Sequence, residues 1–437
     1  MQPKSLSWGK LRTQIGWPAD GWTGLLDLKV LGWVLAYYAL SVLMQLALPA
    51  VEVEGVKLES GGRHHYRFNS LLSAMLVLGA CGVGTIIDGA NFAVWTFIWN
   101  KLPQLVTANL LIASVLSLFV YVRSFQVRPP GRDNPLHREL AKGGHTGNML
   151  YDFFMGRELN PRLRIPNSTP LIGGQTLDVK HFCELRPGML GWVLLDLAFV
   201  AHQYKIHARV SDSIILVTSF QMLYVLDALY NEAAILTTID ITNDGFGFML
   251  AFGDLVWLPF IYSIQCRYLA VYPVNLGLVG LGGVLAVQGF GFYIFRAANN
   301  EKHLFRTNPT DPRVEHLETI STAAGSQLLI SGWWGRARHI NYLGDWIMAW
   351  SYCLPTGIAG YVIHTSRNPL TGHLKTEAVQ DEAHGWGMIF TYFYLIYFSI
   401  LLIHREARDE EKCHKKYGAD WDKYTSIVRS RIVPGIY

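Results

Sequence analysis

Apolar and polar segments alternate along the whole chain, and most of the apolar segments are long. A helix needs about 20 residues to cross the ~30 Å apolar core of a bilayer. The pattern predicts membrane-spanning helices at residues 28–48, 71–87, 104–122, 189–201, 214–230, 246–264, 274–295, 346–363 and 386–403. Two shorter segments, 88–101 and 326–334, suit half-helices, so we expect nine or ten spans.

Polar segments separate these spans. Residues 49–69 have the pattern of a hairpin, residues 296–319 are polar, and the tail at 404–437 is rich in both signs of charge. The longest polar segment, 123–187, carries ten Lys or Arg residues against six Asp or Glu residues. That excess favours the cytoplasmic side of a membrane.

The composition agrees with a polytopic membrane protein of all-α fold. Only 16% of the 437 residues are charged and 51% are hydrophobic, whereas about a quarter of the residues in soluble domains are charged. We therefore expect one integral-membrane domain, 1–437, with about ten transmembrane helices. The five cysteines are scattered and form no CxxC pair, so we expect neither disulfides nor a metal site.

One polar cluster interrupts the apolar sequence in the last third of the chain. Residues 331–345 read SGWWGRARHINYLGD and combine cations, a histidine and aromatic rings between two apolar runs. Arg336, Arg338 and His339 offer charge and hydrogen-bond donors to phosphate. The aromatic residues can stack on planar rings. The alternative interpretation is an interfacial loop with an aromatic belt.

Carboxylate and amide groups gather in residues 227–254, within or beside apolar runs. A carboxylate at the centre of a membrane helix costs about 2.5–3.5 kcal/mol or more, so packing alone does not explain a set of this size. Apolar surroundings raise the pKa of a carboxyl group, which can then hold a proton to donate. Helix capping around a turn at 237–243 is the alternative for single residues. The set is Asp227, Asn231, Glu232, Asp240, Asn243, Asp244 and Asp254.

Basic residues concentrate at 296–306 and in the tail, where residues 404–418 read HREARDEEKCHKKYG. A juxtamembrane anchor with pairs such as Glu411–Lys415 is one interpretation. A pocket for an anionic, adenine-bearing ligand is the other, and residue types alone do not separate the two.

Several stretches resemble the eukaryotic-type sterol reductases. This family comprises delta-14, delta-7 and delta-24(28) sterol reductases and the membrane domain of the lamin B receptor. GNMLYDFFMGRELNPR, which by itself favours a structured loop, and LLIHREARDEEKCHKKYG resemble its two signature motifs. HFCELRPGMLGW, LDALYNEAAILTTIDITNDGFGFMLAFGDLVWLPF and LLISGWWGRARHINYLGD agree as well, and the likeness is greatest to the delta-14 and lamin B receptor branch. Ile340 departs from the proline that relatives commonly have there, which alters a turn and removes no polar group.

The resemblance implies NADPH-dependent reduction of a sterol carbon–carbon double bond, most closely the delta-14 bond, by protonation and hydride transfer. It implies a polar segment 1–23, mainly sterol-side helices in 24–295 and a cofactor-binding half in 296–437. The residues expected to donate the proton are Glu232, Asp240 and Asp244. Those expected to bind NADPH are Lys302, Arg306, Trp334, Arg338, His339, Asn341, Tyr342, Asp345, Arg405, Arg408, Asp409 and Tyr424. No GxGxxG follows a predicted strand, so side-chain cations are expected to replace a Rossmann phosphate loop.

The expected partners are a sterol and the lipid bilayer, with no nucleic acid. We expect a multi-pass protein of the endoplasmic reticulum type of membrane if eukaryotic, or of the inner membrane if bacterial, with its cofactor site facing the cytosol. The alternatives are a delta-7 sterol reductase, a methyltransferase of the isoprenylcysteine type and a membrane receptor without activity. The carboxylate set at 227–254 argues against the methyltransferase, and the retained charged positions argue against the receptor.

Overall fold

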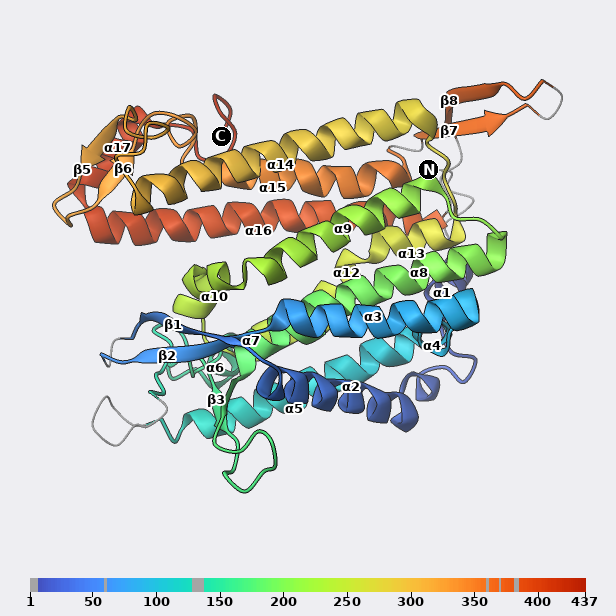
Figure 1. Cartoon of the computed structure of the whole chain (residues 1–437), viewed down its shortest axis with the longest axis horizontal. Coiled ribbons are helices and arrows are strands. Elements are labelled where there is room, and N and C mark those ends of the chain that lie inside the picture. Colours follow the sequence, from blue (N-terminus) through green and yellow to red (C-terminus); the bar gives the residue numbers. More distant parts are fainter. Residues whose placement is uncertain (1–6, 59–60, 128–136, 359–360, 369–370, 381–384) are drawn as a thin grey trace. The chain divides into compact units, whose positions relative to one another are not determined.

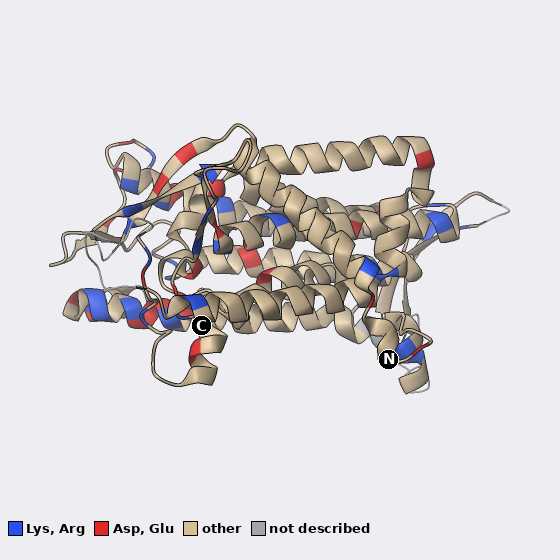
Figure 2. Cartoon of the chain, turned by 90° about the horizontal axis from the view of Figure 1, so that it is seen from below, with Lys and Arg blue, Asp and Glu red and all other residues tan. Residues whose placement is uncertain are grey.

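The computed structural model describes residues 7–58, 61–127, 137–358, 361–368, 371–380 and 385–437 (Figure 1). It is 63% helical, and six helices in the described residues are long and apolar enough to cross a membrane. The prediction of a helix-rich polytopic membrane protein is confirmed, and the expected total of about ten spans stays a prediction. Charged residues lie mostly toward the ends of the long helices (Figure 2), where a membrane-spanning helix meets water.

The described residues form two compact units. The N-terminal unit comprises Leu6–Val210 and Thr218–Pro273, and the C-terminal unit comprises Ser211–Val217 and Val274–Tyr437. The predicted division at residue 296 falls inside the 31-residue helix α14 (Gly277–Thr307).

The N-terminal unit is built from helices that pack around a shared apolar core. Helix α2 (Leu28–Ala47) begins where it does because the Asp27 carboxylate caps the N–H groups of Lys29 and Val30 at 2.9 and 3.3 Å. Buried side chains such as Val120, Phe182 and Leu255 form the core beside it. The other helices are α1 (Trp8–Ile15), α3 (Ser70–Asp88), α4 (Ala93–Asn100), α5 (Leu102–Ser124), α6 (Met149–Met155), α7 (Val179–Cys183), α8 (Gly191–His207), most of α9 (Asp212–Tyr230), α10 (Ile239–Thr242), α11 (Phe248–Phe252), α12 (Leu258–Tyr262) and α13 (Ile264–Val271).

Two π-helical turns bend this unit. The span predicted at 246–264 is confirmed as part of one apolar helical segment, Phe248–Val271, in which α11 and α12 are joined by a π-helical turn at Gly253–Trp257. A second π-helical turn at Glu184–Leu190 contains Pro187, which lacks the N–H that a regular helix would use. The two turns contact each other. Turns of this kind occur frequently at functional sites.

The C-terminal unit consists of α14, α15 (Ile340–Cys353), α16 (Gly385–Tyr417) and α17 (Ala419–Ile427), and Figure 1 shows the first three running side by side. Helices α14 and α15 approach closely where Gly291 faces Gly344. A Cβ added at Gly291 would lie 2.8 Å from the Gly344 carbonyl oxygen, so no larger residue fits without a shift. Close backbone packing through small residues is a common way for membrane helices to associate.

Four two-stranded antiparallel hairpins complete the structure, so the predicted all-α class is incomplete. The prediction of a hairpin at 49–69 is confirmed, but two other predictions are wrong. Residues 326–334 form a strand and turns rather than a half-helix, and the helix expected at 346–363 ends at Cys353, before a strand. The pairs are β1 (Val51–Lys57) with β2 (Arg63–Phe68), β3 (Arg162–Arg164) with β4 (Thr176–Asp178), β5 (Thr319–Ser321) with β6 (Gln327–Leu329), and β7 (Tyr361–Arg367) with β8 (Leu374–Gln380).

Candidate functional site

A cluster of cations and rings occupies the C-terminal unit where α14 and α16 end. The Lys302 ammonium lies 3.7 Å from the centre of the Trp334 ring, a cation–π contact that fixes both side chains. The indole N–H of Trp334 donates to the Ala298 carbonyl at 2.8 Å. Trp334 is buried, while Arg306, one turn of helix beyond Lys302, is exposed.

His339, Asn341 and Tyr342 bring polar atoms to the start of α15. The rings of His339 and Tyr342 stack with centroids 5.0 Å apart, and the Tyr342 hydroxyl donates to Asp409 on α16 at 3.4 Å. Asn341 donates to Asn299 at 3.4 Å. His339 Nε2 and Asn341 Oδ1 are buried and have no hydrogen-bond partner among the described residues. Buried polar atoms seldom stay unpaired, so the two atoms are candidates for ligand contacts.

The electrostatic surroundings set the charge of this cluster. Burial, together with the nearby charges of Lys302 and Arg338, lowers the pKa of His339 to about 3, so the ring is neutral near pH 7. Burial raises the pKa of Asp409, although Lys412 and Lys302 oppose the shift. The cluster therefore combines a neutral imidazole with several cations.

Arg405, Arg408 and Asp345 complete the set that the sequence predicted along α15 and α16. All three are half-buried. Arg405 interacts electrostatically with Asp345 and with Asp409, which places the three side chains near one another. The structure thus brings together Lys302, Trp334, His339, Asn341, Tyr342, Asp345, Arg405 and Asp409.

Arg338 and Tyr424 are held within the fold. Arg338 Nη1 donates to the Val428 and Arg429 carbonyls at 2.9 and 3.2 Å, and its Nε lies 3.2 Å from Glu410. Tyr424 is 5% exposed and packs against Trp421 with ring centroids 4.9 Å apart. Both residues hold the segment that follows α17 in place, and their contacts stabilise the fold next to the cluster.

A second candidate site in the N-terminal unit is centred on Glu232, directly after α9. Its carboxylate is 5% exposed and accepts the backbone N–H of Ser70 at 3.0 Å. The other oxygen lies 3.1 Å from His181 Nε2, although the ring N–H is not aligned for a regular hydrogen bond. Burial raises the pKa of Glu232, but the contacts with His181 and Ser70 outweigh burial and leave the pKa lowered. The expected upward shift is therefore wrong for this carboxyl group.

Asp240 and Asp244 lie around a buried lysine. Lys180 is 1% exposed and its ammonium donates to the backbone carbonyls of Asp240 and Asp244, each at 2.6 Å. Burial lowers the pKa of Lys180 to about 8, and the carboxylates of Asp178, Asp240 and Asp244 oppose the shift. Asp244 is buried and Asp240 half-buried. These two aspartates face a cation, whereas Glu232 faces an imidazole.

Lys180, His181 and Arg186 were missed as site residues at the sequence level. All three are 1% exposed, and Arg186 interacts electrostatically with Glu232. The available signal was their spacing, because three basic residues within seven positions adjoin the apolar run at 189–201. Buried cations require polar or charged partners, and some of these come from elsewhere in the fold, as the Asp240 and Asp244 carbonyls do for Lys180.

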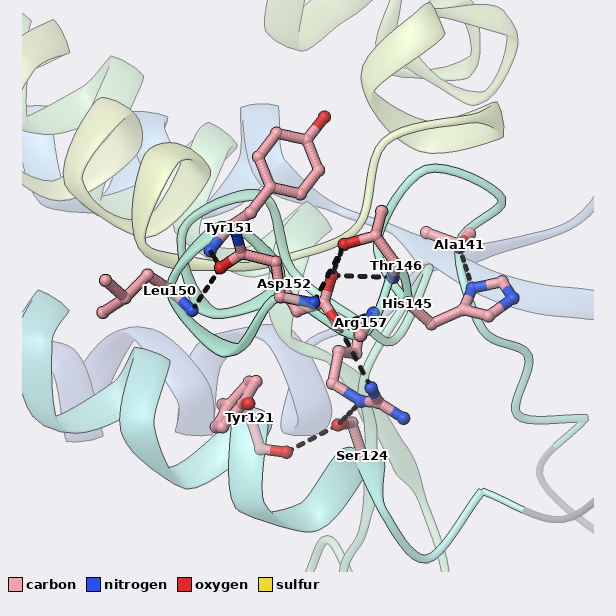
Figure 3. Close-up of polar contacts among 11 residues, drawn as sticks. Tyr121, Ser124, Ala141, His145, Thr146, Leu150, Tyr151, Asp152 and Arg157 are labelled. Atoms are coloured by element: carbon pink, nitrogen blue, oxygen red, sulfur yellow. Dashed lines mark hydrogen bonds and ion pairs between the residues drawn. The ribbon is translucent and has the colours of Figure 1, made fainter.

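The signature motif at 147–162 forms a loop that is closed by its own polar contacts (Figure 3). The Asp152 carboxylate accepts the backbone N–H and the hydroxyl of Thr146, both at 2.8 Å, and pairs with Arg157 at 3.4 Å. Arg157 also donates to the Ser124 hydroxyl at the end of α5, at 3.1 Å. The motif is structured as predicted, although Met149–Met155 within it form the short helix α6, and these contacts hold the motif against α5.

Comparison with known proteins identifies the family. Residues 1–437 match the model described as "Ergosterol biosynthesis ERG4/ERG24 family". The chain belongs to this family. It is 60% identical over 440 residues to Delta(14)-sterol reductase erg24B of Aspergillus fumigatus, covering 100% of this chain and 85% of that protein. It is 53% identical to Delta(14)-sterol reductase of Neurospora crassa (100% and 88% covered) and 44% identical to Delta(14)-sterol reductase erg24 of Schizosaccharomyces pombe (95% and 87% covered).

Membership of the ERG4/ERG24 family confirms the predicted sterol reductase resemblance and the prediction of an oxidoreductase of sterol biosynthesis. The apolar helices agree with its placement in a lipid bilayer.

Proposed function

We propose that the protein reduces the delta-14 double bond of a sterol with NADPH. The observation that carries this proposal is the near full-length identity of 44–60% to proteins named Delta(14)-sterol reductase. The sterol enters from the bilayer, since both the substrate and the long helices are apolar.

The cluster in the C-terminal unit suits NADPH by its chemistry. Lys302, Arg306, Arg405 and Arg408 supply positive charge for phosphate groups, and Arg side chains are suited to bidentate phosphate contacts. His339 Nε2 and Asn341 Oδ1 are the buried polar atoms that ligand groups would satisfy. Trp334 and Tyr342 add ring surfaces, and Asp345 and Asp409 add acceptors for hydroxyl groups. When bound, NADPH supplies the hydride. Because NADPH is a cytosolic metabolite, this cluster faces the cytosol, in a membrane of the endoplasmic reticulum type.

The site around Glu232 suits protonation of the alkene. A hindered alkene accepts hydride readily only after a proton has made one carbon a tertiary cation. Glu232 Oε1 and His181 Nε2 lie 3.1 Å apart, so a proton can pass between them once the ring N–H is aligned. In water-excluded surroundings a neutral acid beside a neutral imidazole is favoured over an ion pair. Arrival of the apolar sterol therefore moves the proton onto Glu232, which donates it. Asp240 and Asp244, beside Lys180, are the other candidate donors.

A side-by-side assay tests the proposed function. Purified protein receives NADPH and, in separate reactions, a delta-14, a delta-7 and a delta-24(28) sterol. We expect a gain of two hydrogens on the delta-14 sterol, measured by mass spectrometry. Reduction of the delta-7 sterol alone would support the alternative delta-7 activity. No reduction of any sterol, together with protection against heat by S-adenosylmethionine and not by NADPH, would support the methyltransferase alternative. No reduction and no protection would support the receptor.

A further inference from the structure

A polar recess lies in the N-terminal unit between the end of α2, two hairpins and α7. It is narrow, and its lining includes Gln45, His65, Arg162, Asp178 and His181. His65 is exposed, so the recess reaches solvent. Asp178 and His181 are 3% and 1% exposed, and they form its buried end.

The lining of the recess carries polar atoms that the protein does not satisfy. Gln45 Oε1, Asp178 Oδ2, Arg67 Nε and Arg162 Nε are buried and have no hydrogen-bond partner in the described part of the chain. Two of these atoms accept hydrogen bonds and two donate them. Water does both, and a polar recess with several such partners is a suitable place for ordered water.

His181 joins the recess to the candidate proton donor. It lines the recess, and its Nε2 lies 3.1 Å from Glu232 Oε1. Aromatic neighbours hold the imidazole in place, with Phe68 stacked at 5.8 Å and Tyr66 tilted at 5.6 Å between ring centroids. An imidazole can take a proton on one nitrogen and release one from the other.

We propose that the recess supplies protons to Glu232 and that His181 is the relay between them. This inference rests on the proposed sterol reduction. In each turnover the alkene takes one proton from Glu232 and one hydride from NADPH. Glu232 then takes a proton from His181, and His181 takes one from water in the recess, so the pair returns to its starting state. Arg186 also interacts electrostatically with Glu232, and its positive charge favours the carboxylate between protonations.

The test compares turnover of two variants with that of the wild-type protein on the delta-14 sterol. His181→Ala removes the relay, so kcat should fall about tenfold or more while KM for the sterol changes little. Imidazole added to the assay should restore part of the loss, because a small base can occupy the recess and carry the proton. His145→Ala is the control. His145 is an exposed histidine two residues before the signature motif, and this variant should keep wild-type turnover whether or not imidazole is added.

The second variant, Gln45→Leu, makes the recess less polar and leaves His181 intact. It should also lower kcat without changing KM. This variant therefore tests the relay even if His181→Ala fails to fold. Wild-type turnover in either folded variant, or a loss in His181→Ala that imidazole does not relieve, would overturn the relay. Inactivity of the wild-type protein on the delta-14 sterol would instead contradict the proposed function, so the two failures are distinguishable.

Discussion

The Tyr342 hydroxyl donates a hydrogen bond to the Asp409 carboxylate at 3.4 Å, and the contact joins the start of α15 to the C-terminal part of α16. Burial raises the pKa of Asp409, with Lys412 and Lys302 nearby to oppose the shift. An ionised carboxylate loses solvation when it is half-buried, so Asp409 lowers the stability of the ligand-free protein. A carboxyl group whose pKa is shifted by burial is characteristic of a ligand-binding site.

Asp409→Asn should stabilise the cofactor-free protein at neutral pH. The folded pKa of Asp409 lies above its unfolded value of 3.8, so its stabilising contribution is complete below that value and is lost as the pH rises through the folded pKa. The amide does not ionise, so the variant should have the higher melting temperature at neutral pH and a smaller advantage in acid. Thermal unfolding at several pH values checks this. A lower melting temperature for the variant at neutral pH would show that the ionised carboxylate stabilises the fold.

Arg405→Ala and Arg408→Ala should weaken NADPH binding more than NADH binding. The cationic cluster has more charge than one pyrophosphate requires, and the surplus suits a 2′-phosphate. Each lost charged hydrogen bond should cost about 1.5–3 kcal/mol, or about ten- to a hundredfold in affinity. Calorimetric titration of NADPH and NADH into each variant measures the loss of affinity. Arg313→Ala, at an exposed arginine in the same unit, is the control. Equal losses for NADH and NADPH would mean that these arginines serve the pyrophosphate or the fold.

Glu232→Gln should lower turnover by roughly 10²–10⁴-fold, the usual contribution of acid–base catalysis, and leave NADPH binding intact. The amide keeps the shape and still accepts the Ser70 N–H, but it has no proton to give. Asp240→Asn and Asp244→Asn are the comparison variants and should lose less, because their backbone carbonyls, which Lys180 binds, remain. Near-normal turnover in all three variants would place the donor elsewhere.

Cysteines introduced at Thr310 and Ser426 should be labelled from the cytosolic side. Both residues are exposed in the C-terminal unit, Thr310 just beyond the end of α14 and Ser426 in the last turn of α17. In sealed membrane vesicles with the cytosolic face outward, an impermeant thiol reagent should modify both positions. His373, in the β7–β8 turn, is the control for the opposite face, because this hairpin bonds to the N-terminal end of α14 through Thr365 and Asn275. Labelling of position 373 alone would reverse the proposed topology.

Gly291→Val should destabilise the C-terminal unit. Its new Cβ would lie 2.8 Å from the Gly344 carbonyl oxygen, and overpacking of this kind costs about 1–3 kcal/mol. Gly283→Ala on the same helix is the matched control, since a Cβ there has nothing within 4 Å among the described residues. Alanine also favours the helix by up to about 1 kcal/mol. Melting temperatures should fall for the first variant and stay level or rise for the second.

The long helices could be predicted from the sequence because burial in lipid leaves an uninterrupted apolar pattern. Helix α2 runs over Leu28–Ala47 against an expected 28–48, and Asp27 provides a recognisable cap. The short strands were mostly missed, because the three-residue pairs of β5 with β6 are held by hydrogen bonds across a turn and carry no periodic pattern. The π-helical turn at Gly253–Trp257 likewise leaves no signal in hydropathy.

Some residues of the candidate sites could likewise be predicted from the sequence, and others could not. Lys302, Trp334 and Asp409 could be found because they cluster in motifs with unusual residue types. Lys180 and His181 could not, because their role depends on partners that lie more than 50 positions away, at Asp240 and Asp244 for Lys180 and at Glu232 for His181. The reversed pKa shift of Glu232 has the same origin, since the Ser70 N–H and the His181 ring come from distant segments.

Isotope tracing on a delta-14 sterol tests the central claim most directly. NADPH deuterated at the transferable position of its nicotinamide should place one deuterium on the tertiary carbon of the reduced bond. The same reaction with ordinary NADPH in D₂O should place one deuterium on the neighbouring carbon, because the proton comes from the protein and is replaced from water. Mass and NMR analysis of the product locates both labels. A reduced sterol without deuterium from NADPH, or no reduction with NADPH, would contradict the account.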